Sequence, residues 1–488
     1  MPKNYAPELI EGGFAVEIAD ADLLHAPLDL ADLAHVLVLL RREVAPAEAG
    51  ARLLDALLVL HETPVAEVGY DPARGEIYNC REDWLAARIG RDAGWLHAGR
   101  PRREAVRIAL RLRLRRDLVG LLEAAASFVV AAGEQADRHA ETFMAEQTYL
   151  QHAQPSTFGH YLLAFAHAAL RDIERLEASL AWLNLSPGGA GGVNGSRLTG
   201  DRSVVADLLG FDGVIEHTRD AMWQTDGYVA LLAGVASLAT TLAKLAEDLE
   251  IWASNEFDYV SLADGHTRTS VLMPQKRNPY ALTMVRGEAG VLIGRLTGLL
   301  AFTKSPSARS DNLIFAYGEV PRALDLASRQ IRLMAGVTAG LTANPERMYA
   351  ALESGYSQAA DLAEFVMVTL GVDYRTAYEV VGATVRRAAA EKIRGIDITG
   401  EMLDAAAVEV TGSPLGASGL DLTEAVDPRA IVRTRVTQGG AEPSVVRVMA
   451  AEAVLAGRAA AGRAEARRTA FDGAEAALLA AVAELRAS

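Results

Sequence analysis

Cysteine, aromatic residues and excess positive charge are all scarce in this 488-residue sequence. The single cysteine, Cys80, cannot form an internal disulfide, and the N-terminal MPKNYAPELI lacks the basic-then-apolar pattern of a secretion signal. Both absences predict a cytoplasmic protein. The formal net charge of −15 argues against a general attraction to nucleic acid or anionic lipid, so an anionic ligand needs a local basic pocket.

Long apolar runs are missing as well. Charges at helical spacing interrupt the apolar segments before they reach the roughly 20 residues that a membrane span needs, so no membrane segment is expected. No alternating run is long enough to predict a sheet, although Val408 and Val432 mark places for a small hairpin. The sequence has neither a phosphate-binding glycine motif nor a Cys/His cluster, which predicts catalysis without a metal or an organic cofactor.

Helical periodicity is what the sequence does contain. Between residues 201 and 254, apolar residues recur at alternating steps of three and four, which is typical of packed helices. A helix of roughly 40 residues starting near Val214 would be about 60 Å long and would find partners in other subunits. Similar seams in residues 162–183 and after Pro279, with a Leu/Ala/Arg-rich stretch at 103–132, predict a central bundle. A Gly-rich loop at 186–200 is either a connector or a mobile anion-binding element.

These patterns predict an all-α protein with three domains. The boundaries are an N-terminal helical domain at 1–106, a central bundle of long helices at 107–345 and a C-terminal helical domain at 346–488.

Residues 269–279 read TSVLMPQKRNP and combine a hydroxyl, a cation and an amide at the start of a helix. Asn278 followed by Pro279 fits an N-cap and a first-turn proline, so free N–H groups of the next helix would point into this loop. Lys276 adds a positive charge. These local features support a carboxylate site and a plain turn, with Ser270 as a turn residue, about equally well.

This loop resembles the signature loop of the fumarase, aspartase and argininosuccinate lyase superfamily, which is close to GSSLMPQKKNP in argininosuccinate lyases. Residues 97–102 (HAGRPR) are similar to that family's HTGRSR, and residues 148–155 (TYLQHAQP) are similar to THLQxAQP. The three motifs stand in the family's order. With residues 359–363 (AADLA), the likeness covers roughly residues 75 to 400.

The resemblance implies a three-domain fumarase/aspartase-type fold and a homotetramer in which loops from three subunits complete each active site. It implies that Ser270 is the proton-abstracting base, that Thr148 assists catalysis and binds a carboxylate, and that a dicarboxylate is bound. The residues expected to bind substrate are Arg102, Arg103, Thr148, Gln151, Lys276 and Asn278.

The sequence departs from the family at the group that protonates the leaving nitrogen. The family's histidine falls at Tyr149, and the glutamate paired with it aligns with Thr283. Three alternatives follow: Tyr149 donates the proton or orients a water, the leaving group needs no strong acid, or His152 serves as the acid. A surface position on a helix is the plainer interpretation of His152.

Other departures concern the substrate. In the family's first motif, which corresponds to residues 97–102 here (motif 1), a serine and an asparagine flank the last arginine. They are replaced by Pro101 and Arg103 in this sequence, and the following aspartate is replaced by Glu104. The region that holds the arginine end of argininosuccinate differs at residues 309–315, so argininosuccinate is not the expected substrate. Whether Arg103 and Arg309 reach the substrate stays open.

The leading interpretation is a carbon–nitrogen lyase, of the ammonia-lyase or amidine-lyase type. It would convert an N-substituted aspartate to fumarate and an amine, or run the reverse addition. The alternatives are a non-catalytic, crystallin-like scaffold of the same fold and a carbon–oxygen lyase acting on a related acid.

Overall fold

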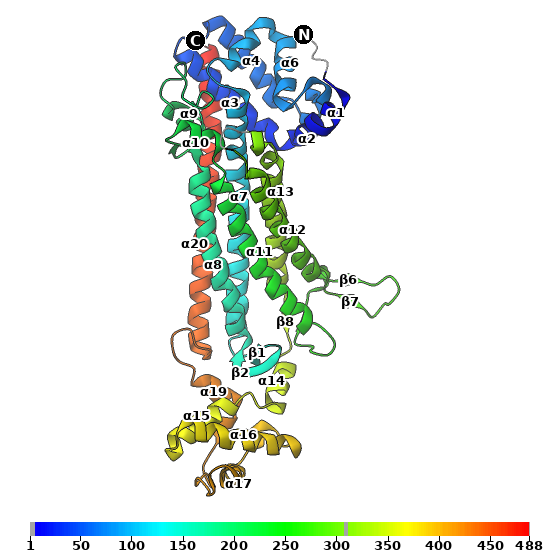
Figure 1. The fold of residues 1–488 in the computed structure, drawn as a ribbon, viewed down its shortest axis with the longest axis vertical. Coiled ribbons are helices and arrows are strands. Elements are labelled where there is room, and N and C mark those ends of the chain that lie inside the picture. The colour runs from blue at the N-terminus through cyan, green and yellow to red at the C-terminus, as the bar shows by residue number, and fades with distance from the viewer. Residues whose placement is uncertain (1–4, 307–310, 488) are drawn as a thin grey trace.

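Six long helices form a bundle through the middle of the molecule (Figure 1). The computed structural model describes residues 5–306 and 311–487. The bundle helices are α7 (Arg102–Arg138), α8 (Phe158–Leu183), α11 (Asp226–Trp252), α12 (Tyr280–Thr303), α13 (Ala316–Ala339) and α20 (Pro443–Ala487). The predicted all-α fold with a central bundle of long helices is confirmed.

Helix α7 begins one residue before the predicted start and runs for 37 residues. Ala, Leu and Arg dominate it, and these are strong helix formers. The predicted helix of about 40 residues from Val214 is wrong. Helix α10 spans Thr218–Trp223 with Gln224 as its C-cap, and the separate helix α11 has 27 residues. Gln224 has an extended backbone with ψ of 135°, and its side-chain oxygen accepts a 2.6 Å hydrogen bond from Arg111.

Buried arginines on α7 fasten the neighbouring segments. Arg111 donates to the carbonyl oxygens of Trp182 (2.7 Å) and Leu183 (3.2 Å), which are among the last carbonyls of α8. Arg115 donates to the carbonyl oxygens of Leu209 (2.7 Å) and Gly210 (3.0 Å). Burial lowers the pKa of Arg115 to about 9, so these carbonyls must replace the water that the cation loses.

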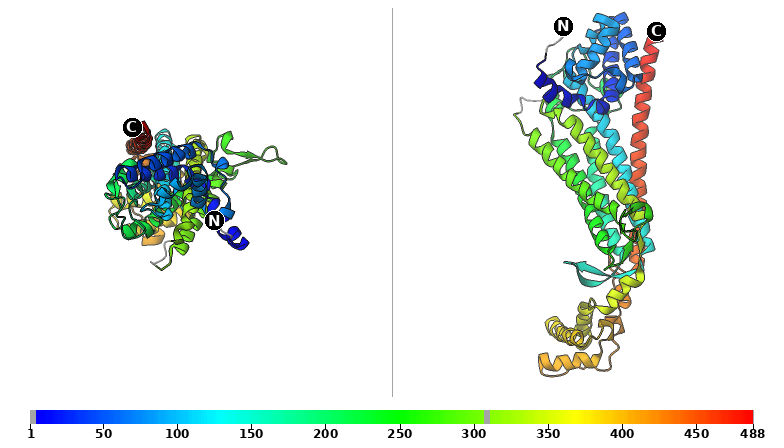
Figure 2. Two further views of the ribbon diagram at one scale, coloured as in Figure 1. Left: turned by 90° about the horizontal axis from the view of Figure 1, so that it is seen from above. Right: turned by 90° about the vertical axis from the view of Figure 1, so that its right-hand side faces the viewer.

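The N-terminal domain caps one end of the bundle and shares its apolar core (Figure 2). Its helices are α1 (Pro7–Leu9), α2 (Ala15–Ile18), α3 (Ala21–Arg41), α4 (Ala47–Glu62), α5 (Val65–Val68) and α6 (Ile77–Ile89). Two short helices, α9 (Ser203–Leu208) and α10, lie beside this end (Figure 1). The domain boundary expected at residue 106 therefore does not divide the core.

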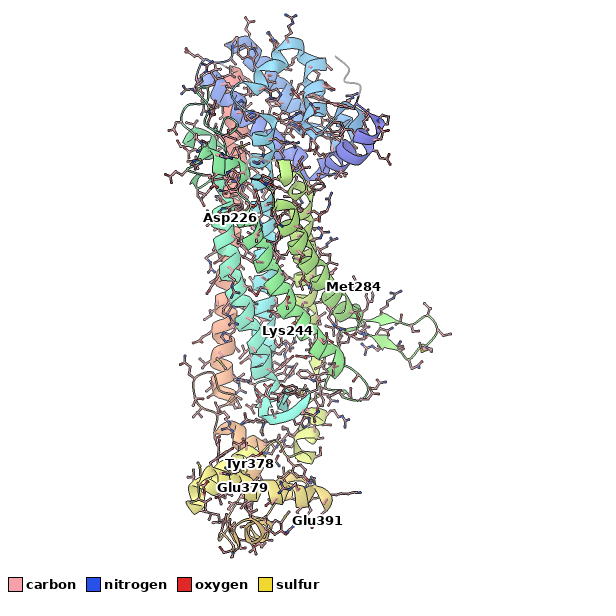
Figure 3. The ribbon with its side chains drawn as sticks, viewed as in Figure 1. Asp226, Lys244, Met284, Tyr378, Glu379 and Glu391 are labelled. Carbon is pink, nitrogen blue, oxygen red and sulfur yellow. The ribbon has the colours of Figure 1, made fainter. Side chains whose placement is uncertain are left out.

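The C-terminal domain lies at the other end and has a core of its own, which includes Leu362, Val380 and Leu403. Figure 3 shows Tyr378, Glu379 and Glu391 there, far from Asp226 at the start of α11. The region beyond the bundle contains α14 (Pro345–Ser354), α15 (Ala359–Leu370), α16 (Tyr374–Ala390), α17 (Gly400–Thr411), α18 (Thr423–Val426) and α19 (Pro428–Arg433).

The predicted C-terminal domain of 346–488 needs correction, because α20 returns to the bundle and packs along α7. Small residues allow the close approach: a Cβ on Gly133 would lie 2.8 Å from Val454 Cγ2, and a Cβ on Gly457 would lie 2.9 Å from Val130 Cγ2. The Arg468 guanidinium also donates to the Glu123 carboxylate. The sequence of α20 is rich in alanine and lacks a pronounced apolar stripe, so it did not predict that this helix returns to the bundle.

Strands occur only as pairs within the described residues. They are β1 (Phe143–Thr148) with β2 (Gln151–Thr157), β3 (Leu185–Ser186) with β4 (Gly213–Val214), β5 (Val260–Ser261) with β8 (Thr342–Ala343), and β6 (Arg268–Thr269) with β7 (Arg277–Asn278). The β3–β4 pair is parallel and the others are antiparallel. Val408 and Val432 lie in helices, so the hairpin considered there is wrong.

Two helices, α3 and α11, are long and apolar enough to cross a membrane by length and composition. Most of each apolar window is buried inside the protein, at 72% for α3 and 56% for α11. Core helices of this kind pass such a test without a membrane.

A buried charge network joins α3, α6 and the motif-1 loop. Arg81, fully buried, donates to Asp29 at 2.7 Å and to Asp32 at 2.9 Å. Arg100 donates to Asp32 at 2.5 Å and to the Tyr78 hydroxyl at 2.7 Å. Although burial alone would raise it, the two guanidinium groups hold the pKa of Asp32 below its usual value.

We expect Arg81→Met to lower the free energy of unfolding by about 3–5 kcal/mol, because two buried carboxylates lose their shared cation. Urea titration followed by circular dichroism measures the change. The matched control is Arg375→Met, which breaks an exposed pair with Glu379 on α16 and should cost under about 1 kcal/mol. Equal losses in the two variants would contradict a structural role for the network.

Candidate active site

The motif-1 loop, residues 97–102, runs into the start of α7 and is fixed from beneath by Arg100. The Arg100 side chain is 2% exposed and also donates to the Ala31 carbonyl oxygen at 2.9 Å. Gly99 has a φ of +74°, and a Cβ there would lie 2.5 Å from Ser196 Oγ. Glycine at this position therefore lets motif 1 lie directly against the Gly-rich loop.

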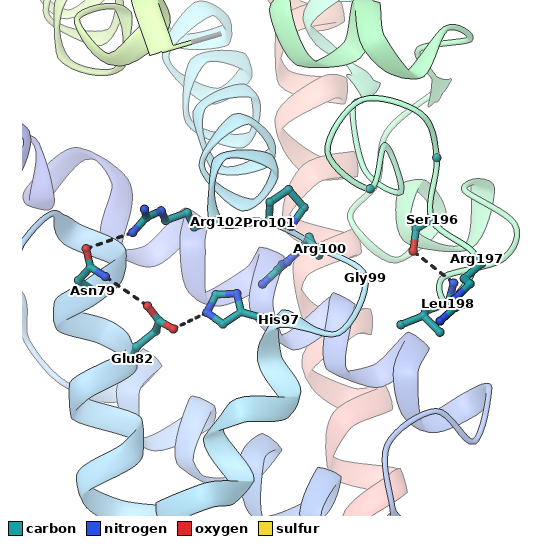
Figure 4. A pocket seen from close by; sticks show the side chains of 12 residues that line it. Asn79, Glu82, His97, Gly99, Arg100, Pro101, Arg102, Ser196, Arg197 and Leu198 are labelled. Atoms are coloured by element: carbon teal, nitrogen blue, oxygen red, sulfur yellow. Dashed lines mark hydrogen bonds and ion pairs between the residues drawn. The ribbon is translucent and has the colours of Figure 1, made fainter. Parts of the chain in front are cut away.

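A hydrogen-bonded chain connects Arg102 with His97 (Figure 4). Arg102 donates to Asn79 Oδ1 at 3.2 Å, Asn79 Nδ2 donates to Glu82 at 3.4 Å, and the other Glu82 oxygen lies 2.5 Å from His97 Nε2. These residues form one wall of a cavity of about 650 Å³. Arg102, which is predicted to bind a carboxylate, thus lies on this wall.

Arg103 points elsewhere. Its guanidinium forms ion pairs of 3.0 Å with both Glu17 and Glu76, and it is not among the residues that line this cavity. Arg103 is thus paired with carboxylates inside the chain, as Arg102 is with Glu76, and its role in binding substrate stays a prediction. Arg309 lies outside the described residues.

The opposite wall of the cavity belongs to the Gly-rich loop, and Glu104 holds that loop. The buried Glu104 carboxylate accepts 2.7 Å hydrogen bonds from the N–H groups of Gly189 and Gly191. Arg202 donates to the Gly188 carbonyl oxygen at 2.8 Å, and Arg42 donates to that of Leu198 at 2.9 Å. These hydrogen bonds fix the Gly-rich loop as one wall of the cavity, so the loop is more than a plain connector. The glycines alone did not predict this.

Motif 2, residues 148–155, begins at the tip of the β1–β2 hairpin. Tyr149 and Leu150 occupy the turn with φ values of 56° and 57°. This left-handed backbone conformation is unfavourable for residues other than glycine. Tyr149 is 96% exposed, and Thr148, Gln151 and His152 are exposed beside it. His152 therefore lies on a strand, not on a helix surface as the plainer interpretation expected.

Motif 3, residues 269–279, lies in the β6–β7 hairpin, whose loop stands away from the bundle (Figure 1). The Ser270 hydroxyl oxygen accepts hydrogen bonds from the N–H groups of Leu272 (3.2 Å) and Met273 (3.0 Å). Lys276 is exposed in the same loop. Asn278 does not cap α12 as predicted; its amide donates to the Arg268 carbonyl oxygen at 2.9 Å and so closes the hairpin.

Within one chain the motifs lie far apart. Arg102 begins α7 and the motif-2 hairpin follows its end, so a helix of 37 residues, about 55 Å long, separates them. The motif-3 loop projects from the side of the bundle. A single chain cannot bring all three motifs to one ligand.

Residues 79–294 match the family model described as "Lyase", and residues 356–433 match that for the argininosuccinate lyase C-terminal region. The argininosuccinate lyase of Methanothrix thermoacetophila is 34% identical over 433 residues, covering 88% of this chain and 87% of the relative. This chain belongs to the argininosuccinate lyase family. It is therefore a lyase of the fumarase/aspartase superfamily.

Two further likenesses agree. The argininosuccinate lyase of Methanothermobacter thermautotrophicus is 31% identical over 422 residues, covering 86% of this chain and 90% of the relative. The solved structure of an EDDS lyase variant with bound fumarate superimposes with a TM-score of 0.88 at 27% identity, covering 99% of this chain and 96% of that one.

The family's usual His/Glu pair has no counterpart at the two aligned positions of this lyase. Thr283 donates to Glu250 at 3.2 Å on the surface of the bundle, and Tyr149 makes the exposed hairpin tip. His97 with Glu82 is a different pair, on the motif-1 wall. No group of three or more His, Cys, Asp or Glu in the described part of the chain is arranged to hold a metal ion.

Glu76 lies beneath the motif-1 wall of the lyase and connects both arginines. It is 2.9 Å from Arg102 and 3.0 Å from Arg103, and burial raises its pKa to about 7. The folded protein therefore binds a proton on Glu76 more tightly than the unfolded chain does. The contribution of Glu76 to stability is fully present at low pH and falls as the pH rises through about 7.

We expect wild type to lose stability relative to Glu76→Gln as the pH rises from 5 to 8, because glutamine mimics the protonated carboxyl and does not titrate. Melting temperatures measured across that range test the expectation. Glu67→Gln, an exposed glutamate on α5, is the matched control. The expectation would be refuted if the difference in melting temperature between wild type and Glu76→Gln stayed constant with pH or changed in the opposite direction.

Proposed function

We propose that this lyase breaks a carbon–nitrogen bond in an N-substituted aspartate and releases fumarate and an amine, or catalyses the reverse addition. Ser270 removes a proton from the carbon next to the carboxylate. The electron pair left on that carbon forms the double bond of fumarate as the carbon–nitrogen bond breaks. The departing nitrogen keeps the bonding pair and takes up a proton.

The hydrogen bonds of Ser270 carry this proposal. A serine can act as a base only when its alkoxide is stabilised, and two backbone N–H groups already point at its oxygen. Lys276 supplies positive charge in the same loop. A serine in an ordinary turn uses the same N–H groups, so the assignment also draws on the EDDS lyase relative, which was solved with fumarate bound.

We further propose that the active protein is a homotetramer with shared sites. Val271, Leu272 and Met273 form the tip of the motif-3 loop with exposed fractions of 109%, 82% and 40%. An apolar tip of this kind is expected to be covered in the working assembly. The separation along α7 requires Thr148 and Arg102 of one site to come from different chains.

Protonation of the leaving nitrogen is assigned to Tyr149. Its place next to Thr148 at the hairpin tip carries the phenol hydroxyl into whichever site the hairpin enters. A phenol hydroxyl is a proton donor that can serve as a general acid for a departing amine. The weakly basic leaving group is the competing explanation, since it needs no acid.

We expect Ser270→Ala to reduce turnover about 1,000-fold or more while the protein stays folded, because the base is removed. Mass spectrometry after incubation with fumarate and a panel of amines, hydroxylamine, hydrazine and nitrite measures adduct formation. Ser261→Ala, at an exposed strand position, is the matched control. If wild type and Ser270→Ala form no adduct with any partner, the scaffold interpretation or a carbon–oxygen lyase takes precedence.

Mixing two inactive variants tests the proposal that each site is shared between subunits. Ser270→Ala and Thr148→Ala subunits, each inactive alone, should regain part of the wild-type activity after mixed reassembly. Some sites of the hybrid then take Ser270 and Thr148 from intact chains. No recovery in an assembly that copurification through two different affinity tags shows to be mixed would argue against sites shared in this way.

Tyr149→Phe separates Tyr149 from the other two explanations for the missing acid, a weakly basic leaving group and His152. If Tyr149 is the acid, turnover should fall about 100-fold or more with a strongly basic amine as leaving group, and little with a weakly basic nitrogen. Full turnover of Tyr149→Phe with both kinds of substrate rules out Tyr149.

A further inference from the structure

The turn of the motif-2 hairpin holds two residues in a backbone conformation that their side chains disfavour. Tyr149 and Leu150 both have positive φ, and the pair of Thr148 with Gln151 closes the hairpin beside them. A two-residue turn with this backbone normally contains Asn-Gly, because asparagine and glycine adopt positive φ at low cost. A strained conformation of this kind persists only where the surrounding structure holds it in place.

The base of the hairpin is attached to the end of the bundle, next to the C-terminal domain (Figure 1). The Phe158 N–H donates to the Thr142 carbonyl oxygen at 2.8 Å, where β2 runs into α8. Trp252 Nε1 donates to the side-chain oxygen of Gln147 at 3.4 Å. The register of the two strands shifts between Ala145 and Gln147, so the hydrogen-bond ladder is interrupted between the base and the turn.

His160, the third residue of α8, connects both strands at this interruption. Its Nδ1 lies 3.6 Å from the Glu146 carboxylate on β1 and 3.3 Å from the Ser156 hydroxyl oxygen on β2. Its Nε2 lies 3.0 Å from the carbonyl oxygen of Gly439, in the segment that leads into α20. The bond with Glu146 raises the pKa of His160, which favours the protonated ring, and both of its nitrogens then donate.

We infer that His160 is a positioning residue for motif 2: it joins β1, β2 and the segment before α20, and so maintains the strained turn that presents Thr148 and Tyr149. This inference rests on the proposed lyase function, in which those two residues act in a site shared with a neighbouring chain. His160 acts through the hairpin and does not touch the substrate. A turn that is already in place need not be ordered during the reaction, which favours a high kcat.

A double-variant cycle tests the link between His160 and the turn. His160→Phe keeps a ring and removes the polar contacts, and Leu150→Asn places at the turn a residue that adopts positive φ readily. With fumarate and the amines described above, His160→Phe should lower kcat about 10-fold and change the KM for fumarate by less than about 2-fold. In the Leu150→Asn background the loss in kcat should be less than about 3-fold, because the turn then depends less on His160.

Two further variants complete the design. His167→Phe, an exposed histidine on the same helix, is the matched control and should leave kcat within about 2-fold of wild type. His160→Gln retains a donor for the Gly439 carbonyl oxygen but cannot carry a charge beside Glu146, so its kcat should lie between those of wild type and His160→Phe. Equal losses from His160→Phe in both Leu150 backgrounds would overturn the inference, since His160 would then act independently of the turn.

Hydrogen exchange separates failure of the inference from failure of the reaction, because it needs no turnover. In the assembled protein, His160→Phe should speed amide exchange in residues 143–157 about 10-fold and leave the middle of α8 unchanged. Adding Leu150→Asn should slow the exchange again. This result upholds the role of His160 even if wild type forms no adduct, and then only the proposed reaction fails. Unchanged exchange at the hairpin in His160→Phe overturns the inference.

Discussion

The buried arginines of α7 are the constraint on which the rest of the architecture depends. Arg111 and Arg115 are held by backbone carbonyls at the ends of other segments rather than by carboxylates. The end of a helix carries partial negative charge, so a cation placed there is stabilised even when it is buried. These contacts set where α8 ends and where the Gly-rich loop begins. They therefore fasten the segments on both sides of the Gly-rich loop to α7, the helix that begins at motif 1.

The same helix separates the chemistry. Its length keeps Arg102 at one end of the bundle and the motif-2 hairpin beyond the other. Ser270, the proposed base, projects from a third position. Each chain is thus well ordered around every motif while lacking a complete site. In the tetramer proposed above, activity is a property of the assembly, and the exposed Tyr149 and Val271 are surfaces for a neighbouring chain.

The sequence was sufficient for the helical class, the bundle and the three motifs, because apolar spacing and turn residues are local signals. It failed where long-range contacts decide. Gln224 breaks a predicted helix because Arg111, far away in sequence, takes its side chain. Helix α20 joins the bundle through glycine contacts that no periodicity reveals. No local pattern shows that Glu17 and Glu76 pair with Arg103, or that the Gly-rich loop faces motif 1.

The return of α20 to α7 has a consequence for synthesis on the ribosome. Helix α7 is made early, yet the face that covers Gly133 and Val130 comes from residues 443–487. During translation that apolar face must wait for some three hundred further residues, exposed to solvent or to chaperones. A nascent chain of this kind completes its bundle only after synthesis of the last helix.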